Sequence, residues 1–174
     1  MMATLDIKIY NNDVIENLAE AVLSHIGYDN VCAVDIVQVA NKLGLNVYTK
    51  ILEDSSGYIK IEGSEKNIYV NELESSKRKR FTIAHEIGHF LLHRNLITNE
   101  QGTVLYRSCT GFNRDMIEIQ ANRCAAALLM PKKLLLEKFR DLECSSFQKI
   151  PILAENFKVS IDAMYTRLST LGAL

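Results

Sequence analysis

The sequence predicts an α+β fold that is mainly helical and contains one small sheet. Residues 12–43 contain two stretches in which apolar side chains recur every three or four positions, the spacing of amphipathic helices. Residues 45–72 change to a two-residue alternation rich in Val, Ile and Tyr, which is typical of strands. Helical periodicity returns after residue 75 and continues to residue 170. Helices, sheet and helices in that order indicate an α+β protein.

Local signals set the ends of the first elements. Asn12 or Asp13 is expected to cap the first helix, which stops at Gly27. Asp35 is expected to cap a second, shorter helix that ends at Gly44. Strands are then expected over 45–52, 56–63 and 66–72, and we expect them to form a three-stranded antiparallel sheet.

The pattern of apolar residues predicts helices throughout the second half of the chain. We expect them over 75–94, roughly 115–130, 131–141 and 149–170, the last broken near Lys158. The two pieces of the last stretch, the second capped by Ser160, resemble a helix-turn-helix. We therefore expect a main domain over 1–141 and a C-terminal helical extension over 142–174, packed together as one compact unit.

Composition and charge limit the possible partners. The 20 basic and 21 acidic residues give a net charge of −1, which provides no overall field for nucleic acid or an anionic membrane. The last helix carries Arg167 as its only cation, beside Asp162, so direct binding to nucleic acid is not expected. No signal peptide and no apolar stretch of membrane-spanning length is present, so we expect a soluble cytoplasmic protein.

The spacing of the cysteines is consistent with the reducing environment of the cytoplasm. They have no CxxC spacing, and we expect free, reduced thiols at all four positions: Cys32, Cys109, Cys124 and Cys144.

The stretch "AHEIGH" contains the spacing of a metal site. Four residues advance an α-helix by about 6 Å, so His85 and His89 project from one face and can hold one ion. Glu86 is next to the first histidine, where its carboxylate can act as general base on a water molecule that attacks a carbonyl. His93 lies about 12 Å from His85 along a continuous helix, so we expect it to pack or to support a ligand, without binding the ion itself.

A hydrolytic zinc site needs a third protein ligand and one open position. Glu118 stands on the next strongly helical segment, with Asn122 one turn further along the same face. Asp115 is a competing carboxylate ligand and Glu100 a weaker one. Glu118 could instead pair with Asp115 in a capping box at the start of the helix, and spacing alone does not separate these alternatives.

The two motifs together, "FTIAHEIGHFLLH" and "IEIQANRCAAALLMP", closely resemble those of the ImmA/IrrE family of zinc metallopeptidase-like proteins. The resemblance covers about residues 35–170 and implies a zincin-like domain. It implies that His85, His89 and Glu118 bind zinc and that Glu86 is catalytic. From their positions on the same helix faces, we expect His93 and Asn122 to support the ligands. Cys124 stands where the family usually has Phe, and Gln120 where a second acidic residue is common.

The resemblance also implies a function. Relatives of this kind act as site-specific proteases on helix-turn-helix repressors of mobile elements or stress regulons. The expected function is thus a cytoplasmic zinc metalloprotease that cleaves such a repressor, an antirepressor acting in transcription regulation. The alternatives are a non-proteolytic zinc-binding regulator, or a toxin of a toxin–antitoxin-like pair that acts by binding protein or DNA.

Overall fold

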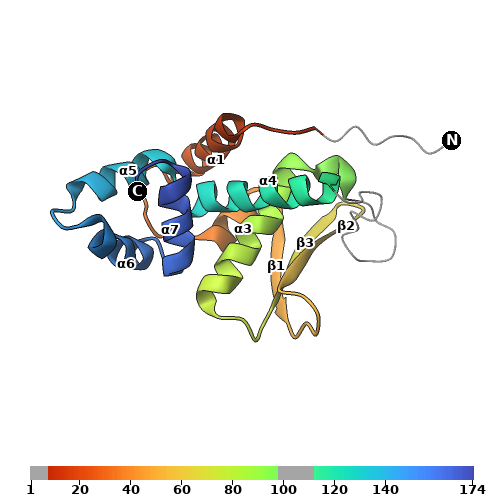
Figure 1. Cartoon of the computed structure of the whole chain (residues 1–174). Coiled ribbons are helices and arrows are strands. Elements are labelled where there is room, and N and C mark those ends of the chain that lie inside the picture. Colours follow the sequence, from red (N-terminus) through yellow and green to blue (C-terminus); the bar gives the residue numbers. More distant parts are fainter. Residues whose placement is uncertain (1–7, 98–111) are drawn as a thin grey trace.

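The computed structural model describes residues 8–97 and 112–174 (Figure 1). The helices and strands in these ranges follow one another in the order α1 (Asn12–Ile26), α2 (Ile36–Lys42), β1 (Asn46–Lys50), β2 (Gly57–Glu62), β3 (Glu65–Asn71), α3 (Ser76–Leu92), a 3-10 turn η1 (Arg94–Leu96), α4 (Phe112–Leu129), α5 (Lys132–Asp141), α6 (Ser146–Asn156) and α7 (Ile161–Thr170). The expected order of helices, small sheet and helices is confirmed.

Side-chain caps begin the first two helices. Asn11, one residue before the expected position, caps α1 by accepting a hydrogen bond from the Val14 amide. Asp35 caps α2 as expected, and its carboxylate accepts bonds from two backbone amides. Gly27 ends α1 with a φ of 89°, in the left-handed region that glycine adopts without strain.

The expected antiparallel arrangement of the three strands is wrong for one of the two pairs. The strand order is β1-β3-β2, and β2 pairs antiparallel with β3, whereas β1 pairs parallel with it. Alternation along a strand identifies the strand but not its neighbour. β3 has the most buried side chains, including Ile68 and Val70, and it takes the centre, while the exposed β1 lies at an edge.

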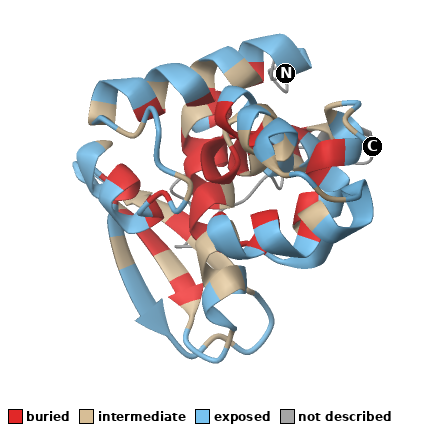
Figure 2. Ribbon diagram, turned by 90° about the vertical axis from the view of Figure 1, so that its left-hand side faces the viewer, coloured by how far each residue is buried: buried red, intermediate tan, exposed pale blue. Residues whose placement is uncertain are grey.

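Helices α3 and α4 form the centre of the molecule. α3 packs most extensively against α4 and also contacts α2, β2 and β3. Figure 1 shows the sheet on one side of α3 and helices α5, α6 and α7 on the other. Figure 2 shows the buried residues concentrated in the central helices, with the outer helices exposing their far faces. The two central helices are therefore held from both sides.

The C-terminal helices follow the expected pattern. α6 and α7 are separated by a short turn in which Lys158 has a φ of 55°, and Ser160 caps α7 as expected. Cys32, Cys124 and Cys144 are free thiols, and Cys109 lies outside the described residues. Over the described ranges, no helix combines the length and apolar character needed to cross a membrane.

Candidate metal centre

Three side chains from two helices meet at one point. His85 and His89 lie one turn apart on α3, and their Nε2 atoms are 2.8 Å apart. Glu118 on α4 places Oε2 3.3 Å from His85 Nε2 and Oε1 3.6 Å from His89 Nε2. The ligand atoms of all three residues lie within 4.8 Å of one another. Among the described residues, no other group of three potential ligands lies this close together.

A glycine lets the two helices approach. A Cβ atom at Gly88 would lie 2.9 Å from the Ala121 carbonyl oxygen and 3.2 Å from the Cβ of Cys124. Only a residue without a side chain fits there unless the backbones separate. The close approach of α3 and α4 brings the carboxylate of Glu118 within reach of both imidazoles. The glycine in "HEIGH" therefore sets the separation of the two helices that carry the ligands.

The alternative roles of Glu118 can be compared with the structure. α4 begins at Phe112, so Asp115 already lies inside its first turn and is not the capping residue. The helix thus begins about one turn before the expected start near residue 115. Glu118 lies beyond the first turn, so the capping-box alternative for this residue is wrong. Asp115 is exposed and does not belong to the cluster. Glu100 lies outside the described residues.

The cluster stabilises positive charge. Burial is the largest single influence on His85 and lowers its pKa, but the carboxylates of Glu118 and Glu86 and the amide of Asn122 raise it more, so the net shift is upward. Burial alone would raise the pKa of Glu118, yet hydrogen bonds from His85 and His89 hold it well below its usual range. The pKa of the more deeply buried His89 falls to about 4, mainly through burial. A cation is thus favoured between these groups, and His89 enters as a neutral ligand.

These residues fit a divalent transition-metal ion. Two imidazole nitrogens and one carboxylate oxygen form a mixed donor set with room for a fourth ligand, the arrangement found in hydrolytic metal sites. The same carboxylates that favour a proton on His85 would stabilise the charge of an ion held there.

Glu86 lies beside the cluster in a different environment. Its side chain is buried, and burial raises its pKa to about 7, against the opposing influence of His85 and a hydrogen bond from the Ile59 backbone. A carboxyl group with a pKa near neutrality can both take up and release a proton under physiological conditions. The two carboxylates of the site therefore have opposite properties: Glu118 stays ionised and Glu86 is a candidate general base.

Polar side chains behind the cluster contact the imidazoles. Asn122 Oδ1 lies 2.9 Å from His85 Nδ1, and His93 Nδ1 lies 3.3 Å from His89 Nδ1. His93 does not belong to the cluster of three. Gln120, fully buried, places Oε1 3.2 Å from His93 Nε2. Gln120 was not among the expected site residues, although a polar residue one turn after Ile117 and one turn before Cys124, on a buried helix face, is a signal that could have identified it.

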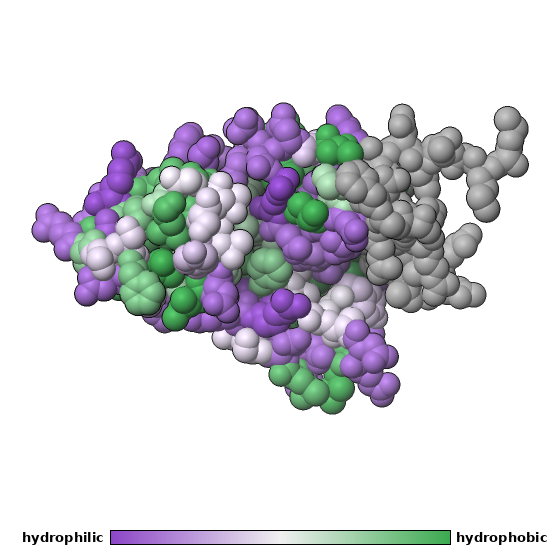
Figure 3. Space-filling model, viewed as in Figure 1, coloured by the Kyte–Doolittle hydropathy of each residue, from purple (hydrophilic) through white to green (hydrophobic). Residues whose placement is uncertain are grey.

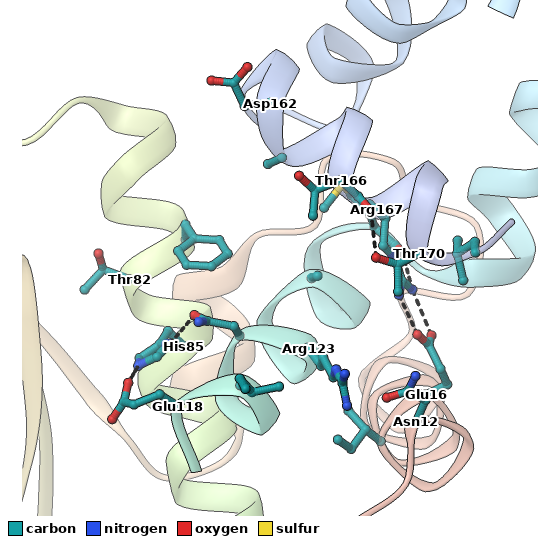
Figure 4. Close-up of a pocket in the computed structure, with 18 of the residues that line it drawn as sticks. Asn12, Glu16, Thr82, His85, Glu118, Arg123, Asp162, Thr166, Arg167 and Thr170 are labelled. Carbon is teal, nitrogen blue, oxygen red and sulfur yellow. Dashed lines mark hydrogen bonds and ion pairs between the residues drawn. The ribbon is translucent and has the colours of Figure 1, made fainter. Parts of the chain in front are cut away.

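The cluster opens into a cleft of about 950 Å³ between α1, α3, α4 and α7. Figure 4 shows His85 and Glu118 at one end, Asp162, Thr166 and Thr170 of α7 along one side, and Asn12 and Glu16 of α1 at the far end. Figure 3 shows hydrophilic and apolar side chains mixed over the face seen in Figure 1. The volume is sufficient for a peptide segment of several residues.

The comparisons with known proteins agree with this geometry. The chain is 22% identical over 160 residues to metallopeptidase ImmA of Bacillus subtilis (strain 168), covering 88% of this chain and 89% of that protein. It shares its fold with a solved Mycobacterium tuberculosis transcriptional regulator, with a TM-score of 0.64 and 17% identity, over 92% of this chain and 47% of that one. The chain thus spans about half the length of the solved protein.

The model of one peptidase family, described as the IrrE N-terminal-like domain, matches residues 40–169. This stretch runs from α2 to the last turn of α7, and it includes the three clustered side chains, Glu86 and their neighbours. The expected family is thereby confirmed: the chain belongs to the peptidase family of the IrrE N-terminal-like domain.

Proposed function

We propose that the chain is a cytoplasmic, zinc-dependent endopeptidase that cleaves a partner protein, a helix-turn-helix transcriptional repressor, and so relieves repression. The observation that carries the proposal is the cluster of His85, His89 and Glu118, with the buried Glu86 beside it, at one end of a peptide-sized cleft. Membership in a peptidase family supports a protein substrate. The repressor as target comes from the family resemblance.

Zinc is the ion we propose for this donor set, with His85 and His89 binding through Nε2 and Glu118 through its carboxylate. When bound, such an ion supplies Lewis-acid chemistry, which polarises a peptide carbonyl and makes water a stronger acid. Glu86 takes a proton from the attacking water and delivers it to the amide nitrogen of the leaving group. Its pKa of about 7 suits both transfers.

The two parts of the chain are proposed to work as one unit. α7 belongs to the C-terminal extension over 142–174, yet Asp162 and Thr166 line the same cleft as His85. Substrate in the cleft would contact residues on both sides of the boundary at 141. DNA binding by α7 receives no support, because Arg167, its only cation, is buried in an ion pair with Glu16.

Substitution of Glu86 tests the chemistry. The wild-type chain and Glu86→Gln are purified, analysed for zinc, and incubated with a helix-turn-helix repressor from the same organism, and the products are identified by mass spectrometry. We expect one zinc per chain in both proteins, a single cleavage site with the wild type, and cleavage at least about 100-fold slower with Glu86→Gln. Equal cleavage by the two proteins would remove Glu86 as the base.

Metal content tests the third ligand. Glu118→Gln should lose most of its zinc, because a neutral amide replaces the anionic ligand, while Asp115→Asn on the same helix should keep a full equivalent. Elemental analysis of the two variants, dialysed side by side, makes the comparison. Loss of zinc from Asp115→Asn instead would assign the ligand to Asp115.

A further inference from the structure

Arg80 joins the helix that carries the two histidines to two distant connections of the chain. Its neighbours Arg78 and Phe81 line the cleft, but Arg80 itself is half-buried and bonds elsewhere. Nη1 donates to the Val34 carbonyl at 2.9 Å, and Nε donates to the Lys158 carbonyl at 3.3 Å. Val34 precedes α2, and Lys158 lies in the turn between α6 and α7. One guanidinium therefore holds together three segments that are far apart in the sequence.

The partners of this guanidinium are backbone groups. Among the described residues, no carboxylate forms an ion pair with Arg80. Burial lowers the pKa of Arg80, and the charge of Asp35, whose carboxylate caps α2, opposes this only in part. Nη2 is buried and has no hydrogen-bond partner in the part of the chain that the structure describes. Because burying a charge with an unused donor costs free energy, the contact is a poor source of stability, and its distinct effect is to fix two carbonyl groups in place.

The turn that Arg80 binds has an uncommon backbone conformation. Lys158 has a φ of 55° and is the one residue other than glycine with a positive φ among those described. Its amide donates to the Glu155 carbonyl at 3.2 Å, and the Val159 amide donates to the Ala154 carbonyl at 2.9 Å. Glycine usually occupies this position at the end of a helix. Because the turn is closed by its own hydrogen bonds, a group that holds the Lys158 carbonyl also holds the start of α7.

The α7 wall of the cleft begins directly after this turn. Asp162 and Thr166 lie in the first two turns of α7 and line the cleft, and Figure 4 shows this part of α7 across the cleft from α3. The separation of α3 from the start of α7 is therefore one dimension of the cleft. A change in it would alter the space for a bound polypeptide but not the metal cluster, whose residues lie on α3 and α4.

Few other contacts fix this separation. The buried side chains of Met164 and Leu168 hold α7 in the hydrophobic core, but among the described elements α7 packs extensively only against α6. The described residues form two polar contacts between α3 and the α6–α7 unit: the bond from Arg80 to the turn, and an ion pair of Lys77 with Glu155. Both side chains of that ion pair are largely exposed, so it contributes little. Arg80 is thus the main polar contact between α3 and this unit.

We propose that Arg80 is a positioning residue that joins α3 to the turn before α7 and so sets the width of the cleft for a substrate. Arg80 belongs neither to the metal cluster nor to the lining of the cleft, and it acts through the position of α7. The inference rests on the proposed function for the nature of the substrate, whereas the contact itself can be examined without substrate or ion.

Steady-state cleavage of a helix-turn-helix repressor from the same organism tests the effect on substrate. Arg80→Met removes the donors and keeps most of the side-chain length, and Arg80→Lys restores one donor. We expect Arg80→Met to keep the zinc content and kcat of the wild type and to raise KM about 10-fold, with an intermediate KM for Arg80→Lys. Arg140→Met is the matched control, because Arg140 is exposed and donates to a carbonyl of its own helix, and it should leave KM unchanged. Wild-type KM in Arg80→Met, or a lower kcat at wild-type KM, would overturn the proposal.

Hydrogen exchange of the metal-free proteins provides a readout that needs neither substrate nor ion. In Arg80→Met the amides of residues 157–166 should exchange about 10-fold faster than in the wild type, while those of α4 keep their rates. Lys77→Met, which removes the exposed ion pair, should exchange as the wild type does. Equal rates in Arg80→Met, or faster exchange spread over all the helices, would overturn the proposal.

Two further outcomes can be told apart. If Arg80→Met does not fold, Arg80→Lys gives the same comparison of exchange rates with a smaller expected difference. A wild-type chain that cleaves no repressor would contradict the proposed function, while the exchange pattern would still decide whether Arg80 holds the turn.

Discussion

Two glutamates in one site show how position determines the chemistry of a side chain. Glu118 lies against two imidazoles that hold its pKa below the usual range, although burial acts in the opposite direction. Glu86 is also buried, and its interactions with His85 and the Ile59 backbone offset only part of the effect of burial. Its pKa therefore rises to about 7. Groups whose pKa values are pushed apart in this way can divide their roles, one as a permanent anion and the other as an acid and base.

The buried Glu86 should destabilise the metal-free protein at high pH. The rise from 4.5 to about 7 corresponds to at most about 3–4 kcal/mol, at about 1.4 kcal/mol per pKa unit. The folded state holds the proton more tightly than the unfolded state, so this cost is absent below about pH 4.5, grows as the pH rises, and is complete above about pH 7. Glu86→Gln removes it, and thermal unfolding of the metal-free variant should occur several degrees above the wild type at pH 8 and close to it at pH 4.5.

Glu118→Gln is the matched control for this measurement. Its ionised carboxylate is stabilised by His85 and His89, so the metal-free variant should unfold below the wild type at pH 8. A lower unfolding temperature for Glu86→Gln at pH 8 would contradict the cost assigned to that carboxylate.

Residue patterns singled out the clustered side chains and the supporting His93 and Asn122, but not Gln120 behind them. The spacing of His85, Glu86 and His89 follows from the geometry of one helix, so the sequence alone placed them together. The partnership of Gln120 with His93 depends on how α4 is turned against α3, which spacing within either helix does not specify. Glu118 needed the second motif, since Asp115 and Glu100 were equally acidic.

At the scale of elements, the site depends on one helix crossing. The histidines lie on α3 and Glu118 on α4, and no covalent constraint within either helix sets the distance between them. That distance follows from contact between Gly88 and Ala121. The helices themselves could be predicted from periodicity, whereas the strand order could not, because β1 pairs with a strand that follows it at a distance in the chain.

Gly88→Ala tests the crossing. The added methyl would lie 2.9 Å from a backbone oxygen, so the helices must separate, at a cost of about 1–3 kcal/mol that the better helix propensity of Ala offsets only in part. We expect a lower free energy of unfolding together with weaker zinc binding. Urea denaturation and chelator competition measure the two, and Ser76→Ala at the exposed start of α3 should change neither. Unchanged zinc affinity in Gly88→Ala would show that the crossing does not set the ligand distances.

At the scale of the molecule, the first and last described helices are joined at the end of the cleft. Arg167 of α7 is 4% exposed, donates from Nη2 to Glu16 Oε2 of α1 at 2.8 Å, and donates to the Met130 carbonyl beyond α4. Periodicity identified α1 and α7 but gave no sign that they meet, since contacts between residues 151 positions apart leave no local pattern.

A double-mutant cycle tests this connection. Arg167→Met leaves Glu16 without its partner and should lower the free energy of unfolding by roughly 3 kcal/mol. Glu16→Gln in the same chain removes the unpaired charge and should recover part of that loss, whereas independent residues would give additive losses. Denaturant titrations of the four proteins provide the free energies. Zinc content should be unchanged throughout, because neither residue belongs to the metal centre.

The arrangement of the cleft has a consequence for biosynthesis. The candidate metal centre uses residues of α3 and α4, but a wall of the cleft comes from α7, which leaves the ribosome after both of them. Domains begin to fold from the N-terminal side during synthesis, so an ion could be bound before the cleft is complete. Only after α7 docks on α1 through Arg167 and Glu16 is the surface for a substrate whole. A nascent chain that had bound an ion would thus still be unable to hold a substrate, which would separate loading of the ion from the onset of the proposed cleavage.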